Sequence, residues 1–140
     1  MATRDRRRYS AATIATIATT STSDAYVIAP VNGVLNEALF SAIDALAQHG
    51  SNYLTFSITN LGQAGAGSNA LLAATDANTT KTTTGSAIAA HTKRTLTLTA
   101  TGSDRRVAAG DRLRIRAAAT GTLANTVTGA NFLLTFFKEV

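Results

Sequence analysis

The stretch GDRLRIRA, residues 110–117, alternates apolar and cationic side chains along most of its length. Successive side chains of a β-strand point to opposite faces of the sheet, so the two kinds of side chain separate onto two faces. The apolar face consists of Leu113, Ile115 and Ala117. The cationic face consists of Arg112, Arg114 and Arg116. The stretch therefore predicts a strand with one face on a core and the other toward water or an acidic partner.

The composition suits a thin β-sandwich better than a wide globule. The chain has 140 residues, of which 45% are hydrophobic, but the most frequent residues are 28 alanines and 24 threonines. A chain of this length forms one domain and buries roughly two thirds of its unfolded surface. Threonine favours strands because its branched Cβ fits a pleated sheet. Small apolar side chains also suggest that neighbouring subunits complete the burial.

Other segments repeat the strand signal. YLTFSIT at residues 53–59 and TLTLTA at residues 95–100 alternate in the same way, with Leu54, Phe56 and Ile58 expected inward. NFLLTFF at residues 131–137 is apolar on both faces, which suggests a strand central to the fold or to a subunit interface. Shorter strands are expected at residues 25–29, 69–75 and 87–90. About eight short strands without alternating helices predict an all-β antiparallel sandwich or barrel.

Residues 34–47 allow two interpretations. Their apolar side chains recur at helical spacing, Asn32 could cap the start of a helix, and Gly50 could end it. This periodicity slightly favours an amphipathic helix. The same residues follow Asn32-Gly33, a strong hairpin signal, and precede a clear strand. In that context they could instead form a long strand with residues 45–52 as a loop.

The N-terminus is more basic than the rest of the chain. Residues 4–8 contain four arginines and one aspartate, and so supply three of the five net positive charges. We expect residues 1–20 to form an extended basic arm and residues 21–140 to form the domain. The start resembles a leader, but the stretch after the arginines is rich in threonine and only weakly apolar, which argues against targeting. No apolar run approaches the roughly 20 residues that span a bilayer.

The sequence offers no catalytic or metal-binding pattern. It contains no cysteine, and His49 and His91 have no metal-ligand spacing between them. Its carboxylates are spread through expected turns, where they act as turn formers. The glycine-rich stretch at residues 62–68 lacks the lysine and the following helix of a phosphate-binding loop. We therefore expect no enzyme activity, no metal and no cofactor.

The order of these pieces resembles the small jelly-roll proteins of tailed bacteriophages, which occur as capsid decoration (cement) proteins and as fibre domains. The pieces that carry the resemblance, within residues 25–137, are AYVIAP, GVLNEALFSAID, NYLTFSITN, KRTLTLT, VAAGDRLRIRA and FLLTFF. The AAGD turn at residues 108–111, ahead of a long strand, is the most telling piece. The resemblance implies a jelly roll in which residues 34–43 are a strand, and an assembly as a trimer or a capsomer-bound module. The arm at residues 1–9 has no counterpart in the resemblance.

The first hypothesis for function is a trimeric decoration protein on the outer surface of a phage head, with the major capsid protein as partner. A fibre or receptor-binding module is the alternative, and nucleic-acid binding through the arm ranks below both. No membrane partner is expected. The residues expected to contact the partner are Arg4, Arg6, Arg7, Arg8, Tyr9, Arg112, Arg114 and Arg116. Each of them could instead be a solvated surface side chain.

Overall fold

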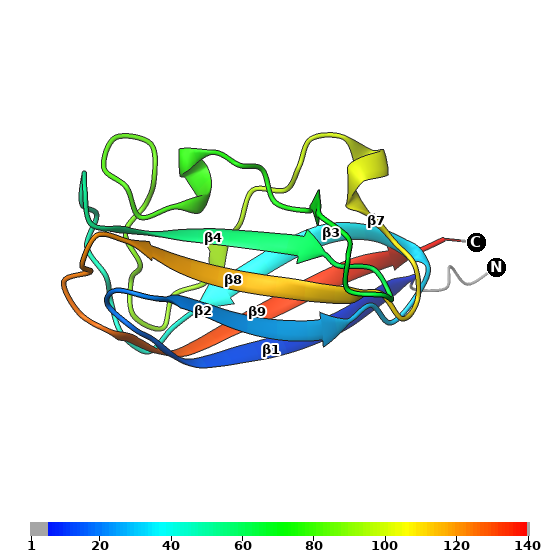
Figure 1. Cartoon of the computed structure of the whole chain (residues 1–140), viewed down its shortest axis with the longest axis horizontal. Helices are drawn as coiled ribbons and strands as arrows, with labels where there is room; N and C mark the ends of the chain where they lie inside the picture. Colours follow the sequence, from blue (N-terminus) through cyan, green and yellow to red (C-terminus); the bar gives the residue numbers. More distant parts are fainter. Residues whose placement is uncertain (1–5, 140) are drawn as a thin grey trace.

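The computed structural model describes residues 6–139, which form a sandwich of two antiparallel sheets (Figure 1). Sheet A has the strand order β1-β9-β3-β6, with β7 also pairing to β3, and sheet B has the order β2-β8-β4-β5. The strands of sheet A are β1 (Arg7–Ile17), β3 (Gly33–Ser41), β6 (Arg94–Thr95), β7 (Arg106–Val107) and β9 (Val127–Lys138). The strands of sheet B are β2 (Thr22–Ile28), β4 (Tyr53–Asn60), β5 (Asn69–Ala70) and β8 (Arg112–Thr120). Two short 3₁₀ helices, η1 (Asp76–Asn78) and η2 (Gly102–Arg105), lie between β5 and β7.

The strand pairing is nested along the chain. The outermost strands β1 and β9 pair, then β2 with β8, then β3 with β6, and finally β4 with β5. The pairs alternate between the two sheets, and β3·β9 and β4·β8 contacts complete each sheet. This is the arrangement of a jelly roll, in which a long antiparallel ribbon wraps into two facing sheets. The expected all-β jelly-roll sandwich is confirmed.

The alternating segments form strands as expected. In β8 the side chains of Leu113, Ile115 and Ala117 are at most 1% exposed, while the arginines between them lie on the outer face. In β4 the side chains of Leu54, Phe56 and Ile58 are buried in the same way. β9 lies between β1 and β3 in sheet A, which confirms a central place in the fold for residues 131–137.

Residues 33–41 form strand β3, so the helix suggested by their periodicity is wrong and the strand implied by the resemblance is confirmed. The reason is an irregularity in the pairing with β9 between Leu35 and Glu37. A bulge adds one residue, so Leu35 and Ala38 both face the core although they are three residues apart. Phe40 then continues on the core face. The bulge interrupts the strict alternation of a strand, and the helical spacing combines core residues such as Ala38 with Val34 and Leu39 of the outer face.

The Asn32-Gly33 turn joins the two sheets, so the expected hairpin is a further error. β2 belongs to sheet B and β3 to sheet A, and the two strands do not pair. Gly33 is required by a close approach, since a Cβ there would collide with the carbonyl oxygen of Phe137. The Asn32 side-chain oxygen accepts a hydrogen bond of 2.8 Å from the Ala109 backbone N–H. This bond ties the turn to the AAGD turn.

The long segment between β4 and β7 arches over one side of the sandwich (Figure 1) and contains less strand than expected. Of the strands expected at residues 69–75 and 95–100, only the two-residue β5 and β6 form, and residues 87–90 contribute one bridge between Ile88 and Leu46. Polar side chains replace the missing ladders. Arg94, packed over the Phe56 ring, donates hydrogen bonds to three backbone carbonyls of residues 77–86. Burial lowers the pKa of Arg94 from its usual high value.

Asn78 is the second polar anchor of this segment and is only 1% exposed. Its side-chain amide donates hydrogen bonds of 2.8 Å to the carbonyls of Ala73 and Thr97. Its side-chain oxygen accepts a bond of 2.7 Å from the Thr97 N–H. Three stretches of the segment are thereby held together without a regular sheet.

Replacement of this anchor, Asn78→Ala, should destabilise the protein by about 2–3 kcal/mol, because it leaves buried backbone groups without partners. Urea unfolding curves of the two proteins measure the difference. Asn125→Ala is the matched control, since Asn125 is exposed and its two hydrogen bonds are open to water. Equal effects of the two substitutions would contradict the role of Asn78.

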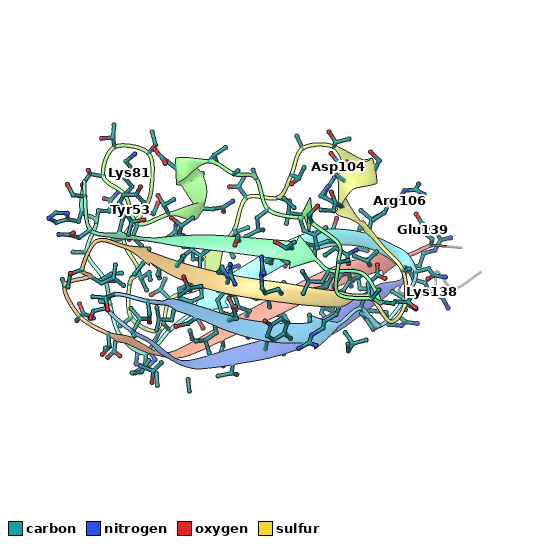
Figure 2. The ribbon with its side chains drawn as sticks, in the orientation of Figure 1. Tyr53, Lys81, Asp104, Arg106, Lys138 and Glu139 are labelled. Carbon is teal, nitrogen blue, oxygen red and sulfur yellow. The ribbon has the colours of Figure 1, made fainter. Side chains whose placement is uncertain are left out.

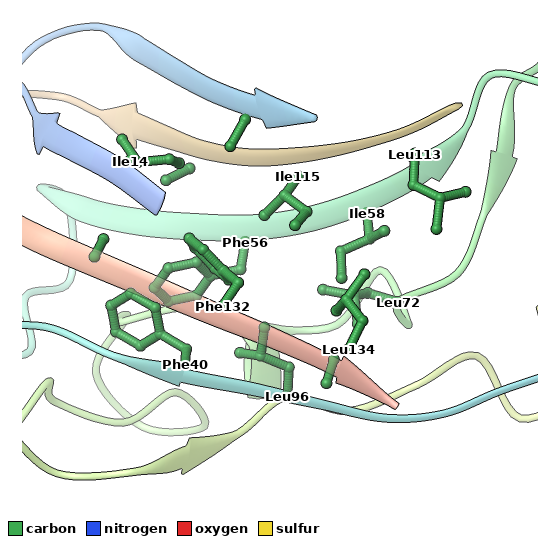
Figure 3. Packing of buried hydrophobic residues seen from close by; sticks show 14 of the residues in the cluster. Ile14, Phe40, Phe56, Ile58, Leu72, Leu96, Leu113, Ile115, Phe132 and Leu134 are labelled. Carbon is green, nitrogen blue, oxygen red and sulfur yellow. The ribbon is translucent and has the colours of Figure 1, made fainter. Parts of the chain in front are cut away.

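Three phenylalanines hold the two sheets together (Figure 3). Phe40 of β3 and Phe132 of β9 come from sheet A, and Phe56 of β4 comes from sheet B. The ring of Phe40 lies 4.7 Å from that of Phe56 and 5.2 Å from that of Phe132, centroid to centroid. These rings are each at most 2% exposed and, with Phe136, are the largest side chains of a core otherwise built from leucine, isoleucine, valine and alanine. They set the spacing of the sheets.

The substitution Phe132→Ala should cost about 3–5 kcal/mol of unfolding free energy, through lost burial and the cavity left behind. Ile28→Ala removes a large apolar side chain that is 58% exposed and should cost less than about 1 kcal/mol. Chemical denaturation of both variants compares the two. A loss below about 1 kcal/mol for Phe132→Ala would show that the three rings do not carry the core.

Candidate partner-binding surfaces

The basic N-terminal residues begin a strand of the sandwich. Arg4 lies outside the described residues, while Arg7, Arg8 and Tyr9 open β1. Arg6 precedes the strand, and its carbonyl accepts a hydrogen bond of 3.0 Å from the Lys138 N–H of β9. All four are exposed. The arginines are thus held at fixed positions along the edge of sheet A.

Most of the described residues of the expected arm, residues 1–20, belong to strand β1 of the sandwich. β1 pairs with β9 from Arg7 to Ile17, and its Ile14 and Ile17 side chains are buried in the core. Residues 7–17 are extended, as the sequence suggests, but they pair within their own chain. The outer edge of β1 has no strand partner within the part of the chain that the structure describes.

The arginine row of β8 lies on the outer face of sheet B, beside β2. Arg116 and Asp24 form a bidentate ion pair. Arg116 donates hydrogen bonds of 2.7 Å from Nε to Oδ1 of Asp24 and of 2.8 Å from Nη2 to Oδ2. The hydrogen bond from Arg116 lowers the pKa of Asp24, and the charges of Arg116 and Arg114 lower it further. The same bond raises the pKa of Arg116. One arginine of the row therefore already holds a carboxylate.

The other two arginines of the row have no carboxylate partner among residues 6–139. The guanidinium of Arg112 lies over the Tyr26 ring, 4.2 Å from its centroid, in a cation–π contact. Arg114 is opposite Tyr26 in the strand register, and its Nε is buried without a hydrogen-bond partner. These two positive charges remain available to an acidic partner.

Strands β1 and β8 begin at the same end of the sandwich (Figure 1), so the N-terminal arginines and Arg112 lie at this end. The Ser10 hydroxyl of β1 lies 3.5 Å from the Ile28 carbonyl of β2, and Ile28 is the register partner of Arg112. Arg106, Glu139 and Lys138 lie at this end as well (Figure 2). Arg106 and Glu139 form an ion pair, with 3.4 Å between Nη1 and Oε1. We call this the cationic end, defined as Arg6, Arg7, Arg8, Arg106, Arg112 and Lys138.

The exposed apolar residues on the outer face of sheet A are harder to predict from the sequence than the arginines. Tyr9, Leu133 and Phe137 are 54%, 38% and 44% exposed on this face. The apolar pattern on both faces of residues 131–137 was the available signal. A hollow of about 270 Å³ lies on the same face, lined by residues that include Ala11, Leu39 and Leu133.

The two histidines are exposed, and their hydrogen bonds are made with backbone groups. The Nδ1 atom of His49 accepts the backbone N–H groups of Ser51 and Asn52. His91 has a positive φ of 55°, and its N–H bonds to the Ala42 carbonyl. Within residues 6–139 no three His, Asp or Glu side chains are grouped to hold a metal ion. In the same range no helix has the length and apolar character needed to cross a membrane.

Comparisons with known proteins show the fold. Neither a protein-family model nor a curated protein matches the chain. A chain of the solved "Cyanophage Pam1 capsid asymmetric unit" matches with a TM-score of 0.51 and 16% identity, over 99% of this chain and 93% of that one. A chain of infectious bursal disease virus, Gx strain, gives a TM-score of 0.46 and 12% identity, and this protein covers 33% of its length. The cyanophage match joins two chains of similar length and shows that they share the same fold.

The ion pair of the arginine row makes a prediction about pH. Asp24→Asn should destabilise the protein by at most about 1 kcal/mol near neutral pH, because the pair lies near the surface. The folded pKa of Asp24 is below its unfolded value of about 3.9, so the contribution is present above that pH and is lost as the pH falls through the folded pKa.

Urea midpoints of the two proteins between about pH 2 and pH 7 test this, and they should converge at the acid end. Asp104→Asn is the control, since Asp104 makes no ion pair in the described part of the chain. A difference between wild type and Asp24→Asn that grows on acidification would contradict the prediction.

Proposed function

We propose that this protein is a structural component of a phage virion, a decoration protein that binds the outside of the assembled head and stabilises it. The observation that carries the proposal is the end-to-end likeness to a chain of similar length from a cyanophage capsid asymmetric unit. The proposed role is structural and not enzymatic, and no catalytic step is assigned to any residue. Its partner is the major capsid protein.

The proposed mechanism is thermodynamic. A protein that binds the assembled shell and not its free subunits stabilises the shell by RT ln(1 + [L]/Kd), about 2.7 kcal/mol per site at a hundredfold excess over Kd. Many sites on one shell multiply this effect. The stabilisation opposes the outward pressure of packaged DNA.

The cationic end is the proposed capsid contact. Arginine can bind a carboxylate through two parallel hydrogen bonds, in bidentate geometry, as Arg116 binds Asp24 in this protein. The strand pairing of β1 with β9 holds Arg7 and Arg8 in place before any partner arrives. Less conformational entropy is then lost on binding than with a flexible tail. The partner surface that this end fits is acidic, and Arg4 is included in the proposal from the sequence alone.

The resemblance to phage decoration proteins leads us to propose a trimer as the bound form. A fibre or receptor-binding module would have the same fold, but the loops of this chain are rich in alanine, threonine and glycine. Such loops offer few side chains for recognition. Nucleic acid fits less well than protein, because the arginines of the N-terminus are not interleaved with exposed aromatic residues.

The test uses heads of the phage that encodes this chain, prepared without the chain. Wild-type protein should co-sediment with them at a copy number of many per head, and cryo-electron microscopy should show it on the outer surface. Arg112→Glu should weaken binding at least tenfold, a change of about 1.4 kcal/mol. Raised salt should weaken it too, because exposed charges are screened.

Lys81→Glu is the matched control, since it makes the same charge change at the opposite end of the sandwich (Figure 2). It should bind as wild type does. Failure of the wild-type protein to bind such heads, or its confinement to a few copies at one vertex or on a fibre, would overturn the proposal.

A further inference from the structure

The outer face of sheet A carries a strip of apolar side chains in two rows, with Tyr9 between them. In the strand register, Ala11 of β1, Leu133 of β9 and Leu39 of β3 lie side by side in one row. Four residues further along β9, Phe137 lies beside Val34 of β3 in a second row. Tyr9 lies between the two rows on β1. We call these six residues the outer strip: Tyr9, Ala11, Val34, Leu39, Leu133 and Phe137.

The outer strip has a hollow in one row and a protruding ring in the other. The hollow of about 270 Å³ is walled by Ala11, Leu39 and Leu133 and bordered by polar groups that include Lys93. The Phe137 ring is 44% exposed. At about 3.3 Å per residue, it lies some 13 Å from Leu133 along β9. One surface thus carries both an apolar projection and an apolar recess.

The charges around the strip suit a second copy of the same chain. Glu37 lies in the row of Thr135 and Tyr9, between the two apolar rows, while Arg7 and Arg106 flank the row of Phe137 and Val34. The face of the strip therefore carries both signs of charge, with one carboxylate among its apolar residues and cations at its border. The outer face of sheet B has three arginines against one aspartate, so two such faces would repel each other. Of the two outer faces, the face of the strip is the one that offers a copy exposed apolar side chains together with a carboxylate, Glu37, that belongs to none of the ion pairs within residues 6–139.

We propose that the outer strip is the contact between copies of this chain, with the Phe137 ring of one copy seated in the hollow of the next. The contact removes exposed aromatic and aliphatic side chains from water, which favours association. It deepens the proposed function by assigning the surface of the homo-oligomer, and rests on that part of the proposal alone. Capsid binding through the cationic end is a separate property.

Light scattering after size-exclusion chromatography tests the contact with the full chain. Wild-type protein should have a mass of at least twice 14.4 kDa, the mass of one chain. Leu133→Glu places a charge in the hollow and should raise the concentration at which the oligomer dissociates at least tenfold. Ile28→Glu is the matched control, because Ile28 is an exposed aliphatic residue on the outer face of sheet B. It should leave the mass unchanged.

Phe137→Ser is a second variant, near the end of β9, which removes the ring without adding a charge. It should also dissociate the oligomer, and far-ultraviolet circular dichroism should show that it keeps its strands. If Leu133→Glu does not fold, this variant decides the test. A monomeric wild-type protein, an oligomer that survives Phe137→Ser, or one that dissociates equally with Ile28→Glu, would overturn the proposal.

The same experiment separates this inference from the proposed capsid contact. A wild-type oligomer that fails to bind phage heads would leave the strip contact intact and remove the decoration role. A monomer that still binds heads would do the reverse.

Discussion

The pairing of β9 on both of its sides is the constraint on which the rest of the structure depends. This last strand lies between β1 and β3 and completes sheet A (Figure 1). Its inward side chains include Phe132, which contacts the phenylalanines of both sheets. Its register with β1 also fixes the basic N-terminus as a strand edge. Fold, core and both proposed surfaces follow from where this strand lies.

Strands whose pattern depends only on their own residues could be predicted from the sequence. β8 and β4 alternate cleanly because both faces of each strand have a constant environment along their length. A helix was the wrong prediction for β3 because a bulge changes which of its residues face the core. A bulge forms against the partner strand, so it depends on residues outside β3. Local spacing could not contain that information. The resemblance to jelly-roll proteins supplied it through the order of the pieces.

The surfaces were harder to predict than the core. The arginine row of β8 is visible as a sequence pattern, but its pairing with Asp24 and Tyr26 requires the register of β2. The N-terminal arginines suggested a separate arm because their strand partner lies more than a hundred residues away. The outer strip combines residues of three strands, so no single stretch of sequence displays it. In each case the missing information was a long-range pairing.

The nested pairing also bears on how the protein folds as it leaves the ribosome. The strand that completes sheet A is the last to be synthesised, so β1 and β3 have no central neighbour until residues 127–138 have emerged. Until then the inner faces of both strands lack the packing that β9 provides. Folds dominated by such distant contacts form slowly, because long loops must close before the contacts that stabilise them. During translation the unfinished sandwich therefore exposes apolar side chains and unpaired strand edges, the condition under which chains aggregate or require a chaperone.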